Sequence, residues 1–171
     1  AVFYIATSFA LAEASGRLGY PRETFLAVQM VASLFLAAAN LSAGSWADRT
    51  SPASTLALGG IGIMLIGLVF GPGLGGGLTL AAITLCATLF VMGFTNSPLA
   101  GWLGSLFPVK VRYSGVAFSH NLGGIVGGGL TPIAAQLLSN AGLGAWTGLL
   151  LSGAGLLTLL GALLGRAATD N

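Results

Sequence analysis

The sequence predicts an all-helical protein that crosses a membrane six times, and two observations carry this prediction. Charged residues make up 6% of the chain and hydrophobic residues 55%, with a mean hydropathy of +0.93, whereas soluble proteins carry about 25% charged residues. The charged residues also bracket three charge-free stretches, residues 24–47, 50–109 and 113–165. A chain with this pattern cannot keep its surface hydrated in water, so we expect it in a lipid bilayer.

Glycine and proline divide the two longest stretches. A hydrocarbon core about 30 Å thick needs roughly 20 mostly apolar residues per helical crossing, so residues 50–109 and 113–165 each have room for two crossings. The run Gly71-Pro72-Gly73-Leu74-Gly75-Gly76-Gly77 divides the first stretch, because Pro lacks a backbone donor and Gly disfavours helix where neighbours do not hold it. Ser139-Asn140-Ala141-Gly142 divides the second. The predicted helices cover residues 1–14, 24–46, 55–71, 78–104, 114–138 and 145–165.

The first and last of these segments add two exclusions. Residues 1–14 start with Ala and are apolar from the first position, and they have neither the basic start nor the small-residue cleavage site that is typical of a signal peptide. We expect the chain to be a piece of a longer protein, cut inside a membrane helix. Residues 143–164 are continuously apolar, whereas a membrane β-barrel needs strands of about ten residues that alternate between its two faces.

The basic residues predict the orientation, because short cytoplasmic loops carry an excess of Lys and Arg. With six crossings, one side holds the basic residues of the second loop, the fourth loop and the tail, namely Arg49, Lys110, Arg112 and Arg166. The other side holds Arg17 and Arg22 in the first loop, next to Glu13 and Glu23. We therefore expect the first side, and with it the carboxy terminus, to face the cytoplasm.

Two loops carry recognisable motifs. The second segment ends in Gly44-Ser45-Trp46-Ala47-Asp48-Arg49, which resembles the Gly-x-x-x-Asp-Arg loop of the major facilitator superfamily. Gly44 would allow close helix contact, and Asp48 and Arg49 would pair with a neighbouring helix end in one conformation and release it in another. An ordinary polar helix end beside a turn is the alternative interpretation. The basic residues that commonly follow this Arg in the superfamily are absent here.

The second motif is more specific. Phe107-Pro108-Val109-Lys110-Val111-Arg112-Tyr113-Ser114-Gly115, followed by Asn121-Leu122-Gly123-Gly124, resembles the metabolite:proton symporter family of that superfamily, which includes carriers of shikimate, α-ketoglutarate, citrate, proline and betaine. His120 stands where the family often has Tyr. The resemblance spans nearly the whole chain and implies the carboxy-terminal half of a twelve-helix carrier, built as two inverted three-helix units. It also implies a proton as coupling ion, a small-molecule substrate and a missing amino-terminal half as partner.

Polar residues within the predicted helices are the candidate substrate contacts, because such groups usually face the bundle interior or a watery cavity. The substrate-binding candidates are Tyr4, Thr7, Gln29, Asn96, His120 and Asn121. The candidate residues of the conformational loops are Gly44, Asp48, Arg49, Arg112 and Tyr113. For Gln29 and Asn96, hydrogen bonding between helices is the alternative role. For His120 the alternative is a partly hydrated position at the cytoplasmic end of its helix, and for Tyr4 it is an interfacial or packing role. The pairs Gly123 and Gly127, Gly124 and Gly128, and Gly161 and Gly165 have the spacing that allows close helix approach.

Other chemistry finds little support in the sequence. One Cys, Cys86, allows no disulfide or Cys-based metal site within this chain, and we expect no enzyme activity, no metal, no organic cofactor and no nucleic-acid partner. The four acidic residues, Glu13, Glu23, Asp48 and Asp170, stand near segment ends or in loops, so we expect a coupling acid in the missing half.

The preferred function is therefore secondary active transport of a small polar metabolite across the cytoplasmic membrane by alternating access. A proton-independent facilitator, a channel and a structural membrane subunit remain as alternatives. The sequence leaves an organic acid, a zwitterion such as betaine and a neutral polar metabolite open as substrates.

Overall fold

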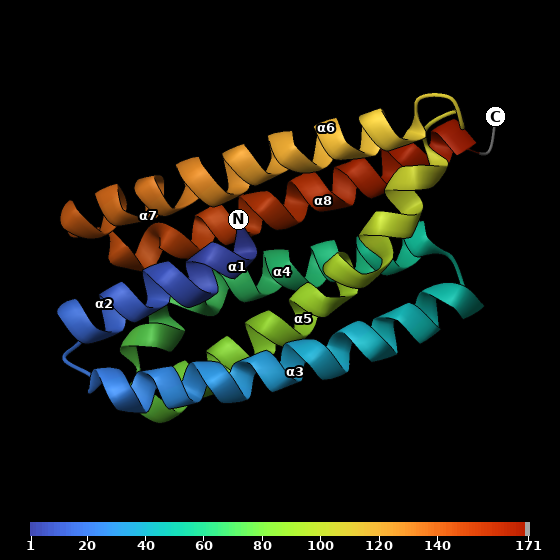
Figure 1. Cartoon of the computed structure of the whole chain (residues 1–171). Helices are drawn as coiled ribbons and strands as arrows, with labels where there is room; N and C mark the ends of the chain where they lie inside the picture. The colour runs from blue at the N-terminus through green and yellow to red at the C-terminus, as the bar shows by residue number, and fades with distance from the viewer. Residues whose placement is uncertain (170–171) are drawn as a thin grey trace.

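The computed structural model describes residues 1–169, with the side chains of residues 145 and 167–169 left out, so Asp170 lies outside it. Every regular element in the described part is helical (Figure 1), which confirms the all-helical class. The α-helices are α1 (Val2–Tyr4), α2 (Ala10–Gly16), α3 (Arg22–Arg49), α4 (Pro52–Gly75), α5 (Leu78–Ser105), α6 (Arg112–Gly124), α7 (Thr131–Asn140) and α8 (Thr147–Thr169). Two π-helical turns, η1 (Ile5–Phe9) and η2 (Ile125–Leu130), and one 3₁₀ turn, η3 (Gly144–Trp146), complete them.

Five helical stretches of the described chain are long and apolar enough to cross a membrane. They are α3, α4, α5, the continuous helix over residues 112–140, and residues 147–166 of α8. The sixth predicted crossing corresponds to α1, η1 and α2, which form a shorter segment that covers only part of the length of the bundle (Figure 1). Five spans are therefore what length and composition establish.

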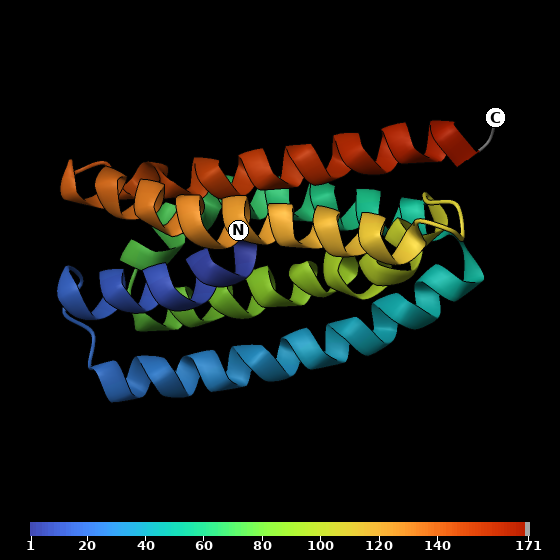
Figure 2. The ribbon, with the colours of Figure 1, turned by 45° about the horizontal axis from the view of Figure 1, so that its top comes forward.

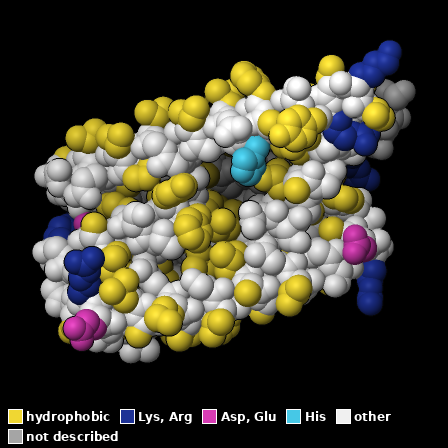
Figure 3. All heavy atoms as spheres, viewed as in Figure 1, with side chains coloured by type: hydrophobic (Ala, Val, Ile, Leu, Met, Phe, Trp, Pro, Cys, Tyr) yellow, Lys and Arg dark blue, Asp and Glu magenta, His cyan; other side chains and the backbone are white. Residues whose placement is uncertain are grey.

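The helices run back and forth between two ends of one bundle (Figures 1 and 2). The connections after α2, α4 and α7 lie at one end, and those after α3 and α5 lie at the other end together with the carboxy-terminal part of α8. Charged side chains gather at these two ends, while the middle of the face in Figure 3 is mainly hydrophobic. This distribution is what a bilayer requires, because a charge in the hydrocarbon core is costly.

Small residues bring α4 and α8 close together. A Cβ added to Gly60 or Gly67 would overlap with α8, and one added to Gly148 or Gly155 would overlap with α4. Gly60 lies opposite Gly155, and Gly67 lies opposite Gly148. The two glycines are seven residues apart on each helix, so they lie on one face and form an antiparallel seam.

This seam corrects the glycine prediction. A Cβ added to Gly123, Gly124 or Gly161 would meet nothing within 4 Å, so the close helix approach expected at these three positions is absent from this structure. Their partners do meet other groups: Gly127 meets Ala1, and Gly128 meets the ring of Tyr4. A spacing of four shows that two glycines share a helix face, but the opposing helix decides whether that face is used.

The glycine-rich run after residue 70 also behaves differently from the prediction. The helix continues through Pro72 to Gly75 instead of ending at residue 71. Phe70, Gly73 and Leu74 are buried there, and the Tyr20 hydroxyl donates to the Leu74 carbonyl at 3.1 Å and accepts from the Gly77 amide at 3.1 Å. Packing and this tyrosine hold the last turn, because satisfying the terminal carbonyls removes the usual weakness of a helix end.

The loop between α3 and α4 has a conventional helix start. Ser51 precedes α4, and its side chain accepts a hydrogen bond from the Ser54 amide at 3.1 Å. Pro52 occupies the first helical turn, where its missing N–H costs nothing. The helix therefore begins three residues before the predicted position 55.

Candidate functional site

Gln29 of α3 joins that helix to the π-helical turn η1. Its amide nitrogen donates to the carbonyls of Ala6 at 3.1 Å and Thr7 at 2.8 Å. A π-helical turn disturbs the normal carbonyl pairing, and Gln29 satisfies two of the carbonyls in η1. The Thr7 hydroxyl donates to the Phe3 carbonyl at 2.7 Å. In this conformation Gln29 therefore serves helix packing, and Thr7 is bonded within its own helix.

Asn96 meets an asparagine that the sequence analysis did not select. Its amide nitrogen lies 3.5 Å from the side-chain oxygen of Asn40, which connects α5 to α3. Gly44, one turn after Asn40 on α3, lies against the hydroxyl of Ser97, the residue that follows Asn96 on α5. Asn40 interrupts the apolar run from Leu34 to Leu41, and this interruption is the signal that could have identified it.

A cleft of about 230 Å³ borders Asn96. Asn96, Tyr4, Thr95 and Thr158 contribute to its lining, and Tyr4 stands 45% exposed with its ring against Gly128. The structure therefore brings Tyr4 and Asn96 together, two of the predicted substrate contacts, in the middle of the bundle.

A larger groove, of about 680 Å³, lies toward the end of the bundle that carries the loop between α5 and α6. Its polar lining consists of Arg112, Tyr113, His120 and Asn121, all exposed. Figure 3 shows the chain's single histidine beside a hollow in the surface. The structure thus places two predicted substrate contacts and two predicted loop residues in one groove.

The donors of this groove are largely unused by the protein. The Arg112 Nε donates weakly to the Phe107 carbonyl at 3.4 Å, and the Asn121 amide nitrogen donates to the Ala117 carbonyl at 2.8 Å. The remaining guanidinium N–H groups, the Asn121 side-chain oxygen and the His120 ring make no hydrogen bond within the described residues. These groups remain available to a polar ligand.

The loop motif itself has a simple structural reason. The ring of Phe107 lies directly against Gly115, where a Cβ would overlap with it. The Val111 amide donates to the Pro108 carbonyl at 3.0 Å, which closes the turn. Phe107, Pro108 and Gly115 therefore shape the loop that presents Arg112 and Tyr113 to the groove.

Asp48 and Arg49 end α3 at the same end of the bundle. Both are exposed, and among residues 1–169 neither makes an ion pair. Gly44, four residues before Asp48, makes the close contact with α5 described above. The helix contact expected at Gly44 is present, while Asp48 and Arg49 face outward in this conformation.

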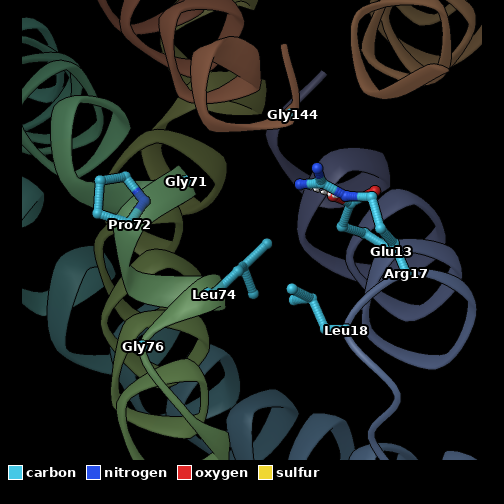
Figure 4. Close-up of a pocket in the computed structure, with 9 residues that line it drawn as sticks. Glu13, Arg17, Leu18, Gly71, Pro72, Leu74, Gly76 and Gly144 are labelled. Atoms are coloured by element: carbon cyan, nitrogen blue, oxygen red, sulfur yellow. Dashed lines mark hydrogen bonds and ion pairs between the residues drawn. The ribbon is translucent and has the colours of Figure 1, made fainter. Parts of the chain in front are cut away.

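The opposite end of the bundle holds a buried carboxylate that sequence reasoning missed. Glu13 of α2 is 6% exposed. Its Oε1 makes an ion pair with Arg17 Nη2 at 2.5 Å (Figure 4). Its Oε2 accepts a hydrogen bond from the Ser139 hydroxyl of α7 at 2.5 Å. Glu13 does stand near a segment end, as its position in the sequence indicated. The only sequence signal for the pair is the spacing of four residues between Glu13 and Arg17.

The described part of the chain contains no cluster of side chains that could hold a metal ion. No group of three His, Cys, Asp or Glu side chains lies close enough to hold a metal ion there. Cys86 is half-buried and lines an apolar cleft formed with Phe35, Ile83 and Phe90.

Comparison with known proteins gives the family. The chain is 37% identical over 170 residues to the inner membrane metabolite transport protein YhjE of Escherichia coli, a match that covers 95% of this chain and 38% of YhjE. Two putative metabolite transport proteins of Haemophilus influenzae are 31% and 30% identical, over 99% and 71% of this chain and 41% and 28% of their own lengths.

The chain therefore spans about two fifths or less of the curated relatives it matches. No family model and no solved structure matches it. The match to YhjE nevertheless runs through both loop motifs, since it covers almost every residue of this chain. The resemblance on which those motifs were interpreted is confirmed, and the chain belongs to the family of these metabolite transport proteins.

Proposed function

We propose that this chain is the carboxy-terminal six-helix half of a carrier that moves a small polar metabolite across the cytoplasmic membrane by alternating access. The names of the three relatives support metabolite transport, and the relative named as an inner membrane protein supports the location. The share of their length that the chain covers agrees with part of a larger carrier. In this proposal α1, η1 and α2 together act as the sixth crossing.

The observation that carries the proposal is the pair of polar clefts in an otherwise apolar bundle. One cleft is lined by Tyr4 and Asn96, and the other by Arg112, His120 and Asn121. In a bilayer, polar side chains are kept where they face other helices or water. In this proposal the two clefts mark successive positions along the substrate's route toward the end that carries the Asp48–Arg49 loop.

The proposed mechanism uses two units of three helices each, residues 2–75 and 78–169. Inverted units of this kind rock around a site near the middle of the membrane. The second half of the carrier, outside this chain, would supply the facing wall. Asp48 and Arg49, exposed here, would pair with a helix end of the other half in the conformation closed at their end, and Arg112 and Tyr113 would move with that step.

The basic residues favour an orientation with the Asp48–Arg49 end in the cytoplasm. Arg49, Lys110 and Arg112 all lie at this end of the bundle, with Arg166 of the last helix. Arg17 and Arg22 lie at the other end. We also propose that a proton is the coupling ion. The acidic residue that binds this proton would lie in the other half of the carrier, because the Glu13 carboxylate is already paired with Arg17 and Ser139.

The test is uptake of a panel of labelled organic acids, betaines and amino acids into proteoliposomes that contain the complete carrier, with and without an inward proton gradient. His120→Ala and Asn121→Ala should each lower uptake at least tenfold. Gln136→Ala, an exposed amide on α7, is the matched control and should leave uptake unchanged. Gradient-driven accumulation supports a symporter, uptake indifferent to the gradient supports a facilitator, and the absence of uptake by folded protein rejects the proposal.

A further inference from the structure

Glu13 is a buried acidic side chain to which the proposed function gives no role. Its side chain is 5% exposed, whereas that of Arg17, its ion-pair partner one helical turn later, is 49% exposed. The second oxygen of Glu13 reaches Ser139, which lies 126 positions away in the sequence and is itself 7% exposed. Figure 4 shows the Glu13 and Arg17 side chains running side by side from α2.

Such a carboxylate is expensive to bury and is kept only where partners compensate for its lost hydration. Here both carboxylate oxygens have a partner. Gly144 of η3 packs so closely over the pair that a Cβ would overlap with Arg17 and approach Glu13 Oε1. The cluster therefore joins three pieces of chain at one end of the bundle: α2, α7 and η3.

The cluster borders empty space. A cleft of about 360 Å³ lies between it and the last turns of α4, lined by Glu13, Arg17, Leu18, Pro72, Leu74 and Gly144 among others (Figure 4). Arg17 has room to change conformation into this cleft. Glu13 also borders the cleft, but only 5% of its side chain is exposed.

The bonds of the cluster differ in what they connect. The ion pair between Glu13 and Arg17 lies within one helical segment, so it survives when that segment moves as a body. The bond from Ser139 crosses to α7, so it breaks when α2 and α7 separate. Separation thus costs one hydroxyl bond and leaves no unpaired buried charge, which would be far more costly.

A π-helical turn lies next to each of the two helices that the Ser139 hydrogen bond joins, α2 and α7. η1 immediately precedes α2, and η2 immediately precedes α7. A π-helical turn has a disturbed hydrogen-bond register and is often found at functional sites. Each turn is a place where the end of the segment can pivot against the rest of the bundle.

We propose that Glu13, Arg17 and Ser139 form a latch that closes the end of the bundle opposite the Asp48–Arg49 loop and opens once in each transport cycle. The latch is closed in this structure. The inference rests on the proposed function, because an opening and closing end has a purpose only in an alternating-access carrier. Glu13 is a positioning residue in this scheme and contacts no substrate.

The test measures access to both ends at once in the complete carrier. On a background without other cysteines, which includes Cys86→Ser, one variant carries Leu18→Cys in the latch cleft and another carries Ala100→Cys in the groove of His120. The rate at which a water-soluble thiol reagent modifies the cysteine is measured in permeabilised membranes, so that the reagent reaches both faces. Glu13→Gln is added to each variant, and Glu23→Gln, an exposed acid at the start of α3, is the matched control.

The latch predicts that Glu13→Gln speeds modification at position 18 about tenfold and slows it at position 100, because opening one end closes the other. Glu23→Gln should change neither rate. Equal rates with and without Glu13→Gln would overturn the proposal, and so would faster modification at both positions, which indicates local loosening. Ser139→Ala, which removes only the bond between α2 and α7, should act in the same direction and serves if Glu13→Gln does not fold.

Transport is measured in parallel, so that the two proposals fail separately. Carrier that takes up no metabolite but shows the reciprocal change in modification rates would reject the substrate panel and keep the latch. Carrier that takes up a metabolite normally, with unchanged rates at positions 18 and 100 in the Glu13→Gln variant, would keep the transport function and reject the latch.

Discussion

Some of the polar side chains use their hydrogen-bonding groups inside the protein, and others leave most of these groups unused. Gln29 has both of its contacts inside the protein, at 2.8 and 3.1 Å. His120 and the Arg112 guanidinium face a groove with most of their donors unused. The same residue types looked equivalent in the sequence, and only the structure separates a packing amide from candidate ligand contacts.

Gln29→Leu should destabilise the folded protein while leaving the groove intact. The change removes two hydrogen bonds to carbonyls of η1. Hydrogen bonds between membrane helices contribute about 0.6 kcal/mol each on average, so the expected loss is about 1 kcal/mol in the free energy of unfolding. Denaturant titration in detergent micelles measures it. Gln136→Leu, whose amide reaches only Asn140 of its own segment, should cost clearly less, and an equal cost would contradict the role of Gln29.

Asn40 and Asn96 should act as one unit in transport. Their side chains meet across α3 and α5 at 3.5 Å, so removing either leaves the other without its partner. Asn40→Ala and Asn96→Ala should each slow uptake by the complete carrier, and the double variant should be no slower than the worse single variant. Fully multiplicative effects would show that the two side chains act independently, because groups that do not interact add in free energy.

At the scale of helices, packing decides where the polar and small residues have an effect. The seam between α4 and α8 uses glycines at a spacing of seven, whereas three of the predicted glycines at a spacing of four lie open. The helix α4 also continues through Pro72, because Tyr20 and buried neighbours hold its last turn. The low helix propensity of Gly and Pro predicted that this helix ends at residue 71, but tertiary packing keeps the chain helical to Gly75.

Gly155→Ala should destabilise the bundle more than Gly153→Ala does. A Cβ at position 155 would overlap with the backbone of α4 at Gly60 and Met64, whereas position 153 has nothing within 4 Å. Overpacking costs typically 1–3 kcal/mol, while the gain in helix propensity of about 1 kcal/mol is common to both variants. Thermal unfolding in detergent compares them, and equal stability of the two variants would argue against a close α4–α8 seam.

The sequence predicted the helices well and their contacts poorly, for a physical reason. Charge-free stretches bounded by Arg22, Arg49 and Arg112 identify membrane helices because the bilayer excludes charge along their whole length. The burial of Glu13 depends on Ser139 and Gly144, more than 120 positions away. No local pattern contains that information, and the same holds for the meeting of Asn40 with Asn96.

The candidate site was predicted in part. Tyr4 and Asn96 do share a cleft, and His120 and Asn121 do share a groove with Arg112 and Tyr113. Their roles in binding stay predictions. Asn40 was missed because a single Asn beside an alanine run is a weak signal, and Thr7 and Gln29 have partners that only the π-helical turn η1 creates.

At the scale of the whole molecule, the two ends of the bundle carry different polar and charged groups. One end carries the motif loops, Asp48, Arg49 and the open groove, and the other carries the closed cluster of Glu13, Arg17 and Ser139. In the proposed carrier, this arrangement would correspond to the state that is closed at the Glu13 end. The other state should reverse both ends.

The orientation of the bundle is testable in whole cells that express the complete carrier. A single cysteine at Ser105, an exposed position at the end of α5, should react with a permeant thiol reagent and stay unreactive to an impermeant one. A cysteine at Gly19, in the loop after α2, should react with both. The reverse pattern would place the Asp48–Arg49 end outside the cell.

Counterflow tests the central claim of carrier transport most directly. Proteoliposomes with the complete carrier are loaded with the metabolite that the uptake panel identifies and diluted into a trace of the same compound in labelled form. A carrier that alternates between two closed ends exchanges inner for outer substrate, so the label should accumulate transiently above its outside concentration. Label that only rises to equilibrium, without an overshoot, would mean a continuous pore and would contradict the account.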